Sequence, residues 1–325
     1  MFNRILVPLD GTPESNAALP LARTVAKATG ATLVLVRVLE RQFPVLPGNE
    51  DEFEEQVQLD ALRVQLQRVA DELAASGVSA ETIATRGPVG EAIVENIRIE
   101  RSDLVIMRTH GRAGVERAAR GSVTEYVLRH STVPLLTLRP GGRRIAAIRK
   151  LLVPVDGSPG GAVALATAAG LARQTGAEIH LLQDVVPVYL QAWSEYEGMT
   201  YYDPAWDDEA LASALSYVNG LAARLQAAGF SATAHAQMVS NVAEHVAETA
   251  TKQECDMIIM STHALSGLPR AAIGSVADAV ARTAQCPVLL VRRPVSRNAV
   301  LADEFYTSET TANESEMKVP QRARP

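Results

Sequence analysis

The residues that decide the fold lie between positions 107 and 122 and read Met107-Arg108-Thr109-His110-Gly111, nine further residues, and Gly121-Ser122. This stretch follows the apolar run Leu104–Ile106 and precedes an amphipathic helical pattern, so it predicts a strand, a glycine-bearing loop and the start of a helix. In α/β folds, a loop of this kind at the carboxyl end of a strand is where phosphate groups bind.

The same stretch occurs a second time, 153 positions later, as Met260-Ser261-Thr262-His263-Ala264, nine residues, and Gly274-Ser275. The beginning of the chain is repeated too, because the strand and turn of residues 5–13 return at residues 151–159. In both copies a hydroxyl residue followed by proline, Thr12-Pro13 and Ser158-Pro159, predicts the start of a helix. The chain is therefore a tandem repeat.

Length and composition favour an ordinary globular protein with two domains. The chain has 325 residues, of which 47% are hydrophobic and 21% charged, and no apolar run approaches the roughly 20 residues that span a bilayer. The N-terminus shows no signal peptide, so we expect a cytoplasmic protein without a membrane partner. Cys255 and Cys286 lie beside predicted strands, which favours buried thiols over a disulfide. A net charge of −6 argues against nucleic acid as the main partner, although a local basic pocket for a small phosphate ligand stays open.

Each half alternates five strands with four helices. This order predicts an α/β fold of two tandem doubly wound five-stranded parallel sheets with strand order 3-2-1-4-5. We expect domains at residues 1–144 and 145–297, and a disordered tail at 298–325, where charged residues follow no apolar period. Pro20 falls inside the first helical pattern and is expected to kink that helix.

The second half carries seven extra residues within positions 187–208, a segment rich in aromatic side chains. We expect these side chains either to pack over the sheet edge or the other half, or to form a lid or a partner surface. The aromatic residues are Tyr189, Trp193, Tyr196, Tyr201, Tyr202 and Trp206.

The candidate site lies where the first and fourth strands end. Pro8-Leu9-Asp10 ends the first strand of the first half, and in strand order 3-2-1-4-5 this end neighbours Met107–Gly111 across the crevice where the strand order reverses. Gly111 would let backbone N–H groups approach a phosphate, and the helix that starts at Ser122 would add free N–H groups. Plain helix capping is the alternative for this serine, because Ser122 to Glu125 fits a capping box, as Ser275 to Asp278 nearly does.

His110 and His263 are the two histidines, of six, that coincide between the repeats. Each either hydrogen-bonds its own loop or contacts a phosphate. No carboxylate pair, serine nucleophile or cysteine ligand coincides with them, so neither a catalytic triad nor a metal site is expected.

These motifs together resemble the universal stress protein family. The resemblance rests on a strand with Pro-x-Asp-Gly-(Ser/Thr), then Thr-His-Gly, nine residues and Gly-Ser, then Pro-Val-Leu-Leu-Val, and it covers nearly all of residues 3–140 and 149–294. It implies that ATP, alone or with Mg²⁺, is the ligand of a Gly-x2-Gly-x9-Gly-(Ser/Thr) pattern. In the first half the implied contacts are Pro8, Leu9 and Asp10 to the nucleoside, Val38 to adenine, and Met107, Arg108, Thr109, His110, Gly111, Gly121, Ser122 and Val123 around the phosphates. In the second half they are Pro154, Val155, Asp156, Asp184, Met260, Ser261, Thr262, His263, Ala264, Gly274, Ser275 and Val276.

Both copies depart from that glycine pattern. Arg108 stands where the first glycine is expected, and it either pairs with phosphates or fills the space of the ribose and phosphates. In the second half Ser261 and Ala264 replace both leading glycines, and Asp184 places a carboxylate where the first half has Val38. We therefore rank the first-half site above the second.

The resemblance implies an ATP-binding stress-response regulatory module. Its two halves are expected to pack as an intramolecular pseudo-dimer, because the apolar runs after Pro134 and Pro287 would otherwise be exposed sheet edges. Association of two whole chains into a homodimer stays open. One alternative is a protein-interaction scaffold of the same fold that binds no nucleotide. Another is an enzyme of a related fold with slow ATP hydrolysis, although no base with a partner is evident.

Overall fold

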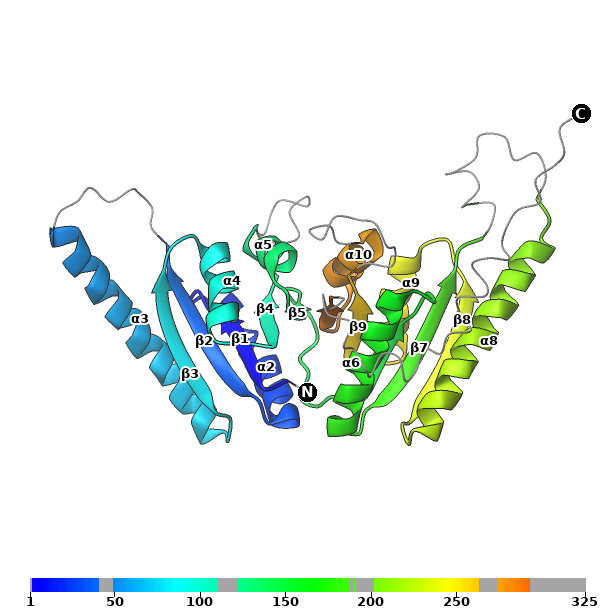
Figure 1. Ribbon diagram of the computed structural model, residues 1–325, viewed down its shortest axis with the longest axis horizontal. Helices are drawn as coiled ribbons and strands as arrows, with labels where there is room; N and C mark the ends of the chain where they lie inside the picture. The colour runs from blue at the N-terminus through cyan, green and yellow to red at the C-terminus, as the bar shows by residue number, and fades with distance from the viewer. Residues whose placement is uncertain are drawn as a thin grey trace, which may run out of the picture.

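The computed structural model describes residues 2–40, 49–109, 122–187, 190, 202–262 and 274–292. Its centre is a single ten-stranded sheet with strand order β3-β2-β1-β4-β5-β10-β9-β6-β7-β8 (Figure 1). Each half therefore has the predicted order 3-2-1-4-5, and the α/β fold class is confirmed.

The two halves contain the same succession of strands and helices, apart from the break between α1 and α2. The first half consists of β1 (Arg4–Pro8), α1 (Pro13–Asn16), α2 (Leu19–Thr29), β2 (Thr32–Leu39), α3 (Asn49–Ala75), β3 (Ala80–Arg86), α4 (Val89–Ile99), β4 (Leu104–Arg108), α5 (Ser122–His130) and β5 (Leu135–Leu138). The second half consists of β6 (Lys150–Pro154), α6 (Pro159–Thr175), β7 (Glu178–Val185), α8 (Ala205–Ala227), β8 (Ala232–Met238), α9 (Val242–Lys252), β9 (Met257–Ser261), α10 (Ser275–Thr283) and β10 (Val288–Val291).

The halves join through their last strands. β5 and β10 pair antiparallel, with Leu136 opposite Leu289, whereas the strand pairs within each half are parallel. The predicted pairing of the two sheet edges is thus confirmed, and it converts two five-stranded sheets into one. The pairing removes two apolar edges that would otherwise be open to other chains.

Helices cover both faces of the sheet, which explains why its strands are almost continuously apolar. Because side chains alternate along a strand, Ile5 and Val7 point to the face covered by α2, α3, α6 and α8, and Leu6 points to the face covered by α4, α5, α9 and α10. In Figure 1, α3 runs beside β3 at one outer end of the sheet and α8 beside β8 at the other.

The two halves begin their first helices alike but continue them differently. The hydroxyls of Thr12 and Ser158 accept hydrogen bonds from N–H groups three residues on, at 3.1 and 3.3 Å, so the predicted caps are confirmed. The kink expected at Pro20 is a complete break: α1 ends at Asn16, and Pro20 lies in the first turn of α2, where its missing N–H costs no intrahelical bond. In the second half Ala166 occupies the equivalent position, and α6 runs unbroken.

Both cysteines are free and buried, as predicted. Burial raises the pKa of the Cys255 thiol to about 11 and that of Cys286 to about 12. No helix in the described part of the chain is long and apolar enough to cross a membrane.

The aromatic segment is described only in part. Tyr202 and Trp206 meet edge to face near the start of α8, with ring centroids 6.4 Å apart, and the Tyr202 hydroxyl donates to Asp207. Tyr189, Trp193, Tyr196 and Tyr201 lie outside the described residues, as does the expected tail at 298–325. The two alternatives for the segment, and the proposed domain boundaries, stay predictions.

Candidate functional site

A crevice with a volume of about 410 Å³ lies in the second half, at the carboxyl ends of β6, β7 and β9. This is the point where the strand order reverses, which is the usual ligand position in a doubly wound sheet. Its walls come from the strand ends, the first turn of α6, helix α9 and the N-terminus of α10. The lining residues are Pro154, Val155, Asp156, Gly161, Leu182, Asp184, Val242, Val246, Met260, Ser261, Thr262, Gly274, Ser275, Val276 and Ala277.

The crevice brings together the second-half residues that the sequence singled out. The segments 154–156, 260–262 and 274–276, together with Asp184, all line it, although more than 100 residues separate the first segment from the last. His263 and Ala264 lie outside the described residues. The sequence-based prediction missed Val242 and Val246 of α9, whose signal was their spacing of four on one helical face.

One side of the crevice is apolar. Leu182, Val242, Val246 and Met260 line it, and three of these four side chains are buried in the core between the sheet and the helices of that face. Such a surface suits a flat heterocyclic ring better than a charged group, because charges are costly to remove from water.

The N-terminus of α10 also lines the crevice. Gly274 is the N-cap residue, so the N-cap position makes no side-chain hydrogen bond to the first turn in the part of the chain that the structure describes. Ser275 is the first helical residue, so the capping-box interpretation is wrong for this copy, and the exposed serine does not close the helix end. The N–H groups of the first turn therefore have no intrahelical partners, and they favour an anion.

Gly274 is held by close backbone contact. Its N–H donates to the carbonyl oxygen of Thr262 at 2.7 Å, and a Cβ at this position would lie 3.2 Å from that same oxygen. Its φ of −59° is open to every residue type, so the close approach, rather than the dihedral angle, favours glycine here.

The two predicted nucleoside-binding aspartates also shape the turns that contain them. The Asp10 carboxylate accepts hydrogen bonds from the Thr12 N–H at 2.8 Å and from the Thr12 hydroxyl at 2.6 Å. The Asp156 carboxylate accepts the Ser158 N–H at 3.0 Å. Each aspartate thus fixes the turn between the first strand of its half and the following helix.

Asp184 is paired inside the protein. Its side chain is 1% exposed, and its Oδ1 lies 2.7 Å from Nδ1 of His245 on α9, whose Nε2 lies 3.3 Å from the Thr249 hydroxyl. The Oδ2 atom is buried and has no hydrogen-bond partner in the part of the chain that the structure describes. Burial raises the pKa of Asp184, although the contact with His245 acts to lower it.

The partner of Asp184 was missed at the sequence level, yet the repeat contains its signal. At the equivalent positions the first half has Val38 and Ala92, so both members of the pair change together between the two copies. Among the described residues, no three His, Cys, Asp or Glu side chains gather closely enough to hold a metal ion.

The first-half site is described at its strand ends. Pro8, Val38 and Val123 are half-buried and Met107 is buried, and the Leu9 N–H donates to the Val36 carbonyl oxygen at 2.8 Å. Thr109 is buried, and its N–H donates to the Leu138 carbonyl oxygen at 3.0 Å, as Thr262 does to Val291 in the second half. His110, Gly111 and Gly121 lie outside the described residues, as does the side chain of Ser122, so the relative rank of the two sites stays a prediction.

Arg108 ends β4 and lies at a second cavity. The preceding Met107 belongs to the core under α4 and α5, so strand alternation directs Arg108 to the opposite face of the sheet. There it lines a cavity of about 230 Å³ together with residues of α2 and of the segment that connects the halves.

Comparisons with known proteins agree with this geometry. A sequence profile described as the universal stress protein family matches residues 1–139 and 147–292. A universal stress protein of Mycobacterium tuberculosis is 25% identical over 308 residues, covering 89% of this chain and 97% of the relative. Another, from Methanocaldococcus jannaschii, is 31% identical over 151 residues, covering 45% of this chain and 83% of the relative. The solved structure of a universal stress protein from Archaeoglobus fulgidus covers 90% of this chain and 97% of its own, with a TM-score of 0.65 at 20% identity.

Proposed function

Because the chain belongs to the universal stress protein family, with two tandem copies of the family domain, we propose that it is a stress-response regulatory protein that binds ATP in the crevice of its second half. The observation that carries this proposal is the crevice itself, which is lined both by apolar side chains and by a helix N-terminus whose N-cap residue, Gly274, offers no side-chain cap. A nucleotide has the same two parts, a flat base and a chain of anionic phosphates.

The dimensions and chemistry of the crevice support a nucleotide. Its volume of about 410 Å³ falls in the range of about 300–1,000 Å³ that small-molecule sites occupy. The side with Val242 and Val246 would take the base, and the N–H groups at the start of α10, with the Ser275 hydroxyl, would take the phosphates. Mg²⁺ would accompany the phosphates, since proteins usually bind it together with them.

The proposal extends to the first half on the basis of the sequence. There Pro8, Asp10, Val38 and Val123 repeat the frame of the second-half crevice, while the expected phosphate loop lies outside the described residues. From the similarity of the two halves we propose two sites, and the structure describes the walls of the second one.

Equilibrium dialysis of the full chain against ATP and Mg²⁺ tests the proposal. The variant Gly274→Val should remove binding to the second site, because its side chain would collide with the Thr262 carbonyl oxygen and displace the start of α10. Gly220→Val is the matched control, since Gly220 is exposed on α8 and a Cβ there meets no atom within 4 Å. Gly111→Val and Gly121→Val together should remove the first site.

The interaction scaffold is the competing function, and one observation favours it. Ser261 and Ala264 replace both leading glycines of the expected phosphate-binding pattern, so a Cβ stands at each position where backbone would otherwise approach a phosphate. No binding by the wild-type chain at millimolar ATP would overturn the nucleotide proposal and support the scaffold. Turnover on the order of 1 s⁻¹ or faster would instead indicate an enzyme.

A further inference from the structure

The second cavity lies at the junction of the two halves and is lined by arginines. Its volume is about 230 Å³, and its walls come from the start of α2, the ends of β4 and β5, the connecting segment and Pro287 ahead of β10. Four arginines line it: Arg108, Arg139, Arg143 and Arg144. It has no lining residue in common with the crevice of the second half.

Among the described residues, none that lines this cavity is acidic. The chain as a whole carries a net charge of −6, so the gathering of four arginine residues around one cavity runs against its composition. Like charges held close together repel, and the buried apolar wall formed by Leu21 and Ile145 weakens the screening by water. An anion in the cavity would relieve that repulsion.

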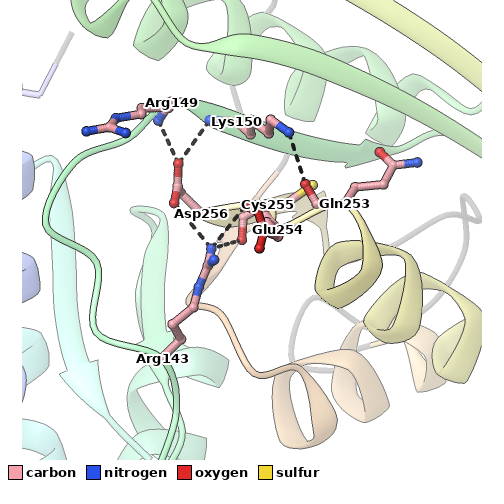
Figure 2. A network of polar contacts seen from close by, with 7 residues as sticks. All are labelled: Arg143, Arg149, Lys150, Gln253, Glu254, Cys255 and Asp256. Carbon is pink, nitrogen blue, oxygen red and sulfur yellow. Dashed lines mark hydrogen bonds and ion pairs between the residues drawn. The ribbon is translucent and has the colours of Figure 1, made fainter.

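Two of the arginines are fixed in place by bonds to the second half. Figure 2 shows Arg143 reaching the turn before β9. Its Nη2 donates to the Glu254 carbonyl oxygen at 3.2 Å, to Oδ1 of Asp256 at 3.2 Å and to the Cys255 carbonyl oxygen. Arg139 donates from Nη1 to the Thr283 carbonyl oxygen at 2.8 Å. A guanidinium has five N–H donors, so each retains donors beyond these bonds.

The other two arginines have no such bonds. The side chains of Arg108, which is half-buried, and Arg144, which is exposed, have no hydrogen-bond or ion-pair partner among the residues that the structure describes. The Asp256 carboxylate pairs with Arg143 and also accepts hydrogen bonds from the backbone N–H groups of Arg149 and Lys150, as Figure 2 shows. Its charge is therefore shared among three partners.

We propose that this junction cavity is a binding site for a phosphate-sized oxyanion, held by Arg108 and Arg144, whose side chains have no partner in the described part of the chain, and by Arg139 and Arg143, which the second half holds in place. Guanidinium groups match the geometry of phosphate and stay charged at every physiological pH. The volume is smaller than the roughly 300 Å³ at which sites for drug-sized ligands begin, so a single oxyanion fits the cavity better than a whole nucleotide.

The occupant would connect the two halves. Arg108 and Leu21 belong to the first half, the linker supplies Arg143 and Arg144, and Pro287 belongs to the second half. An anion that binds the folded chain but not the unfolded chain would raise the free energy of unfolding, and the increase grows with the logarithm of the anion concentration. The junction would thus respond to free phosphate independently of the nucleotide crevice.

Calorimetric titration of the full chain with inorganic phosphate tests this proposal, with sodium chloride at equal ionic strength as the reference. We expect one site per chain. Arg144→Gln and Arg108→Gln should each weaken phosphate binding roughly tenfold or more, because each removes charge-assisted hydrogen bonds to the anion. Neither side chain makes a hydrogen bond or ion pair among the described residues, so both variants should fold. Circular dichroism would check this. Arg144→Lys should recover part of the affinity.

Arg68→Gln is the matched control, because it removes the same charge from an exposed position on α3 outside the cavity. Phosphate binding that is absent in the wild type, or that falls equally in Arg68→Gln, overturns the proposal. So does phosphate binding that Gly274→Val abolishes and Arg144→Gln leaves intact, because the phosphate would then occupy the crevice. ATP binding is measured separately on Arg144→Gln, so failure of the nucleotide proposal leaves the phosphate result interpretable.

Discussion

Asp184 and His245 form the clearest difference between the two halves at the scale of single residues. They stand where the first half has Val38 and Ala92, and they place a buried carboxylate beside a crevice that is otherwise apolar on that side. Since Oδ2 of Asp184 has no hydrogen-bond partner among the described residues, ionisation of this carboxyl is costly. Its raised pKa expresses that cost.

The raised pKa predicts a specific dependence of stability on pH. In the folded chain Asp184 retains its proton to a higher pH than in the unfolded chain, so its contribution to the free energy of unfolding falls as pH rises from about 3.9 through the raised value. Asp184→Asn carries no such charge. We expect this variant to gain stability relative to the wild type as the pH rises above about 3.9, the pKa of an unfolded aspartate, as measured by denaturant unfolding.

Asp208→Asn is the control for that experiment, because Asp208 is exposed on α8. Its stability relative to the wild type should change little over the same pH range. A relative loss of stability in Asp184→Asn as pH rises would show instead that the ionised Asp184 is stabilised by His245.

At the scale of elements, each half caps a helix of the other half with an arginine. Arg292, which follows β10, donates to the carbonyl oxygens of Ser131 at 2.9 Å, Arg129 at 3.2 Å and Leu128, all at the end of α5. Arg139, which follows β5 at the equivalent position, donates to the Thr283 carbonyl oxygen at the end of α10. A cation at this end satisfies carbonyls that the helix cannot pair itself.

The two capping arginines should differ in their contribution to stability. Burial lowers the pKa of Arg292. Its removal leaves three carbonyl oxygens poorly paired, whereas removal of Arg139 leaves one at the end of α10. We expect Arg292→Met to lower the free energy of unfolding by about 2–3 kcal/mol and Arg139→Met by about 1 kcal/mol. Chemical denaturation measures both, and equal losses would contradict the unequal bonding.

At the scale of the whole molecule, the sheet is continuous through the antiparallel pair of β5 and β10. Leu136 and Leu289 face each other across this seam, both are 1% exposed, and both belong to the core beneath α2 and α6. The core of one half therefore continues into the core of the other. We expect the chain to unfold in one cooperative transition rather than one half at a time.

A double-mutant cycle measures the coupling across the seam. Leu136→Ala and Leu289→Ala should each cost about 2–5 kcal/mol, and the double variant should deviate from additivity by about 0.5–3 kcal/mol, because the two side chains share a contact.

Leu33→Ala combined with Leu289→Ala is the control pair, since β2, which carries Leu33, lies four strands from β10. The losses of stability from these two substitutions should therefore add. Calorimetry that shows two separate transitions in the wild type would contradict a single cooperative unit.

The sequence by itself determined the repeat, the strand order and the pairing of the halves. These features rest on local patterns: apolar runs of strand length, helix starts such as Thr12-Pro13, and two apolar edges that would aggregate if left unpaired. The repeat also located the strand ends that line the crevice, because parallel strands end at one edge of a sheet.

Only the tertiary structure decided which side chains meet. The sequence left Arg108 between two roles in the first-half crevice, and both stay predictions; the structure adds that Arg108 lines the junction cavity, because strand alternation places it on the face opposite Met107. Likewise, the sequence named Asp184 but could not show its partner 61 residues away on α9. Long-range contacts depend on how helices pack on the sheet, whereas sequence patterns report the period of each element and not its neighbours.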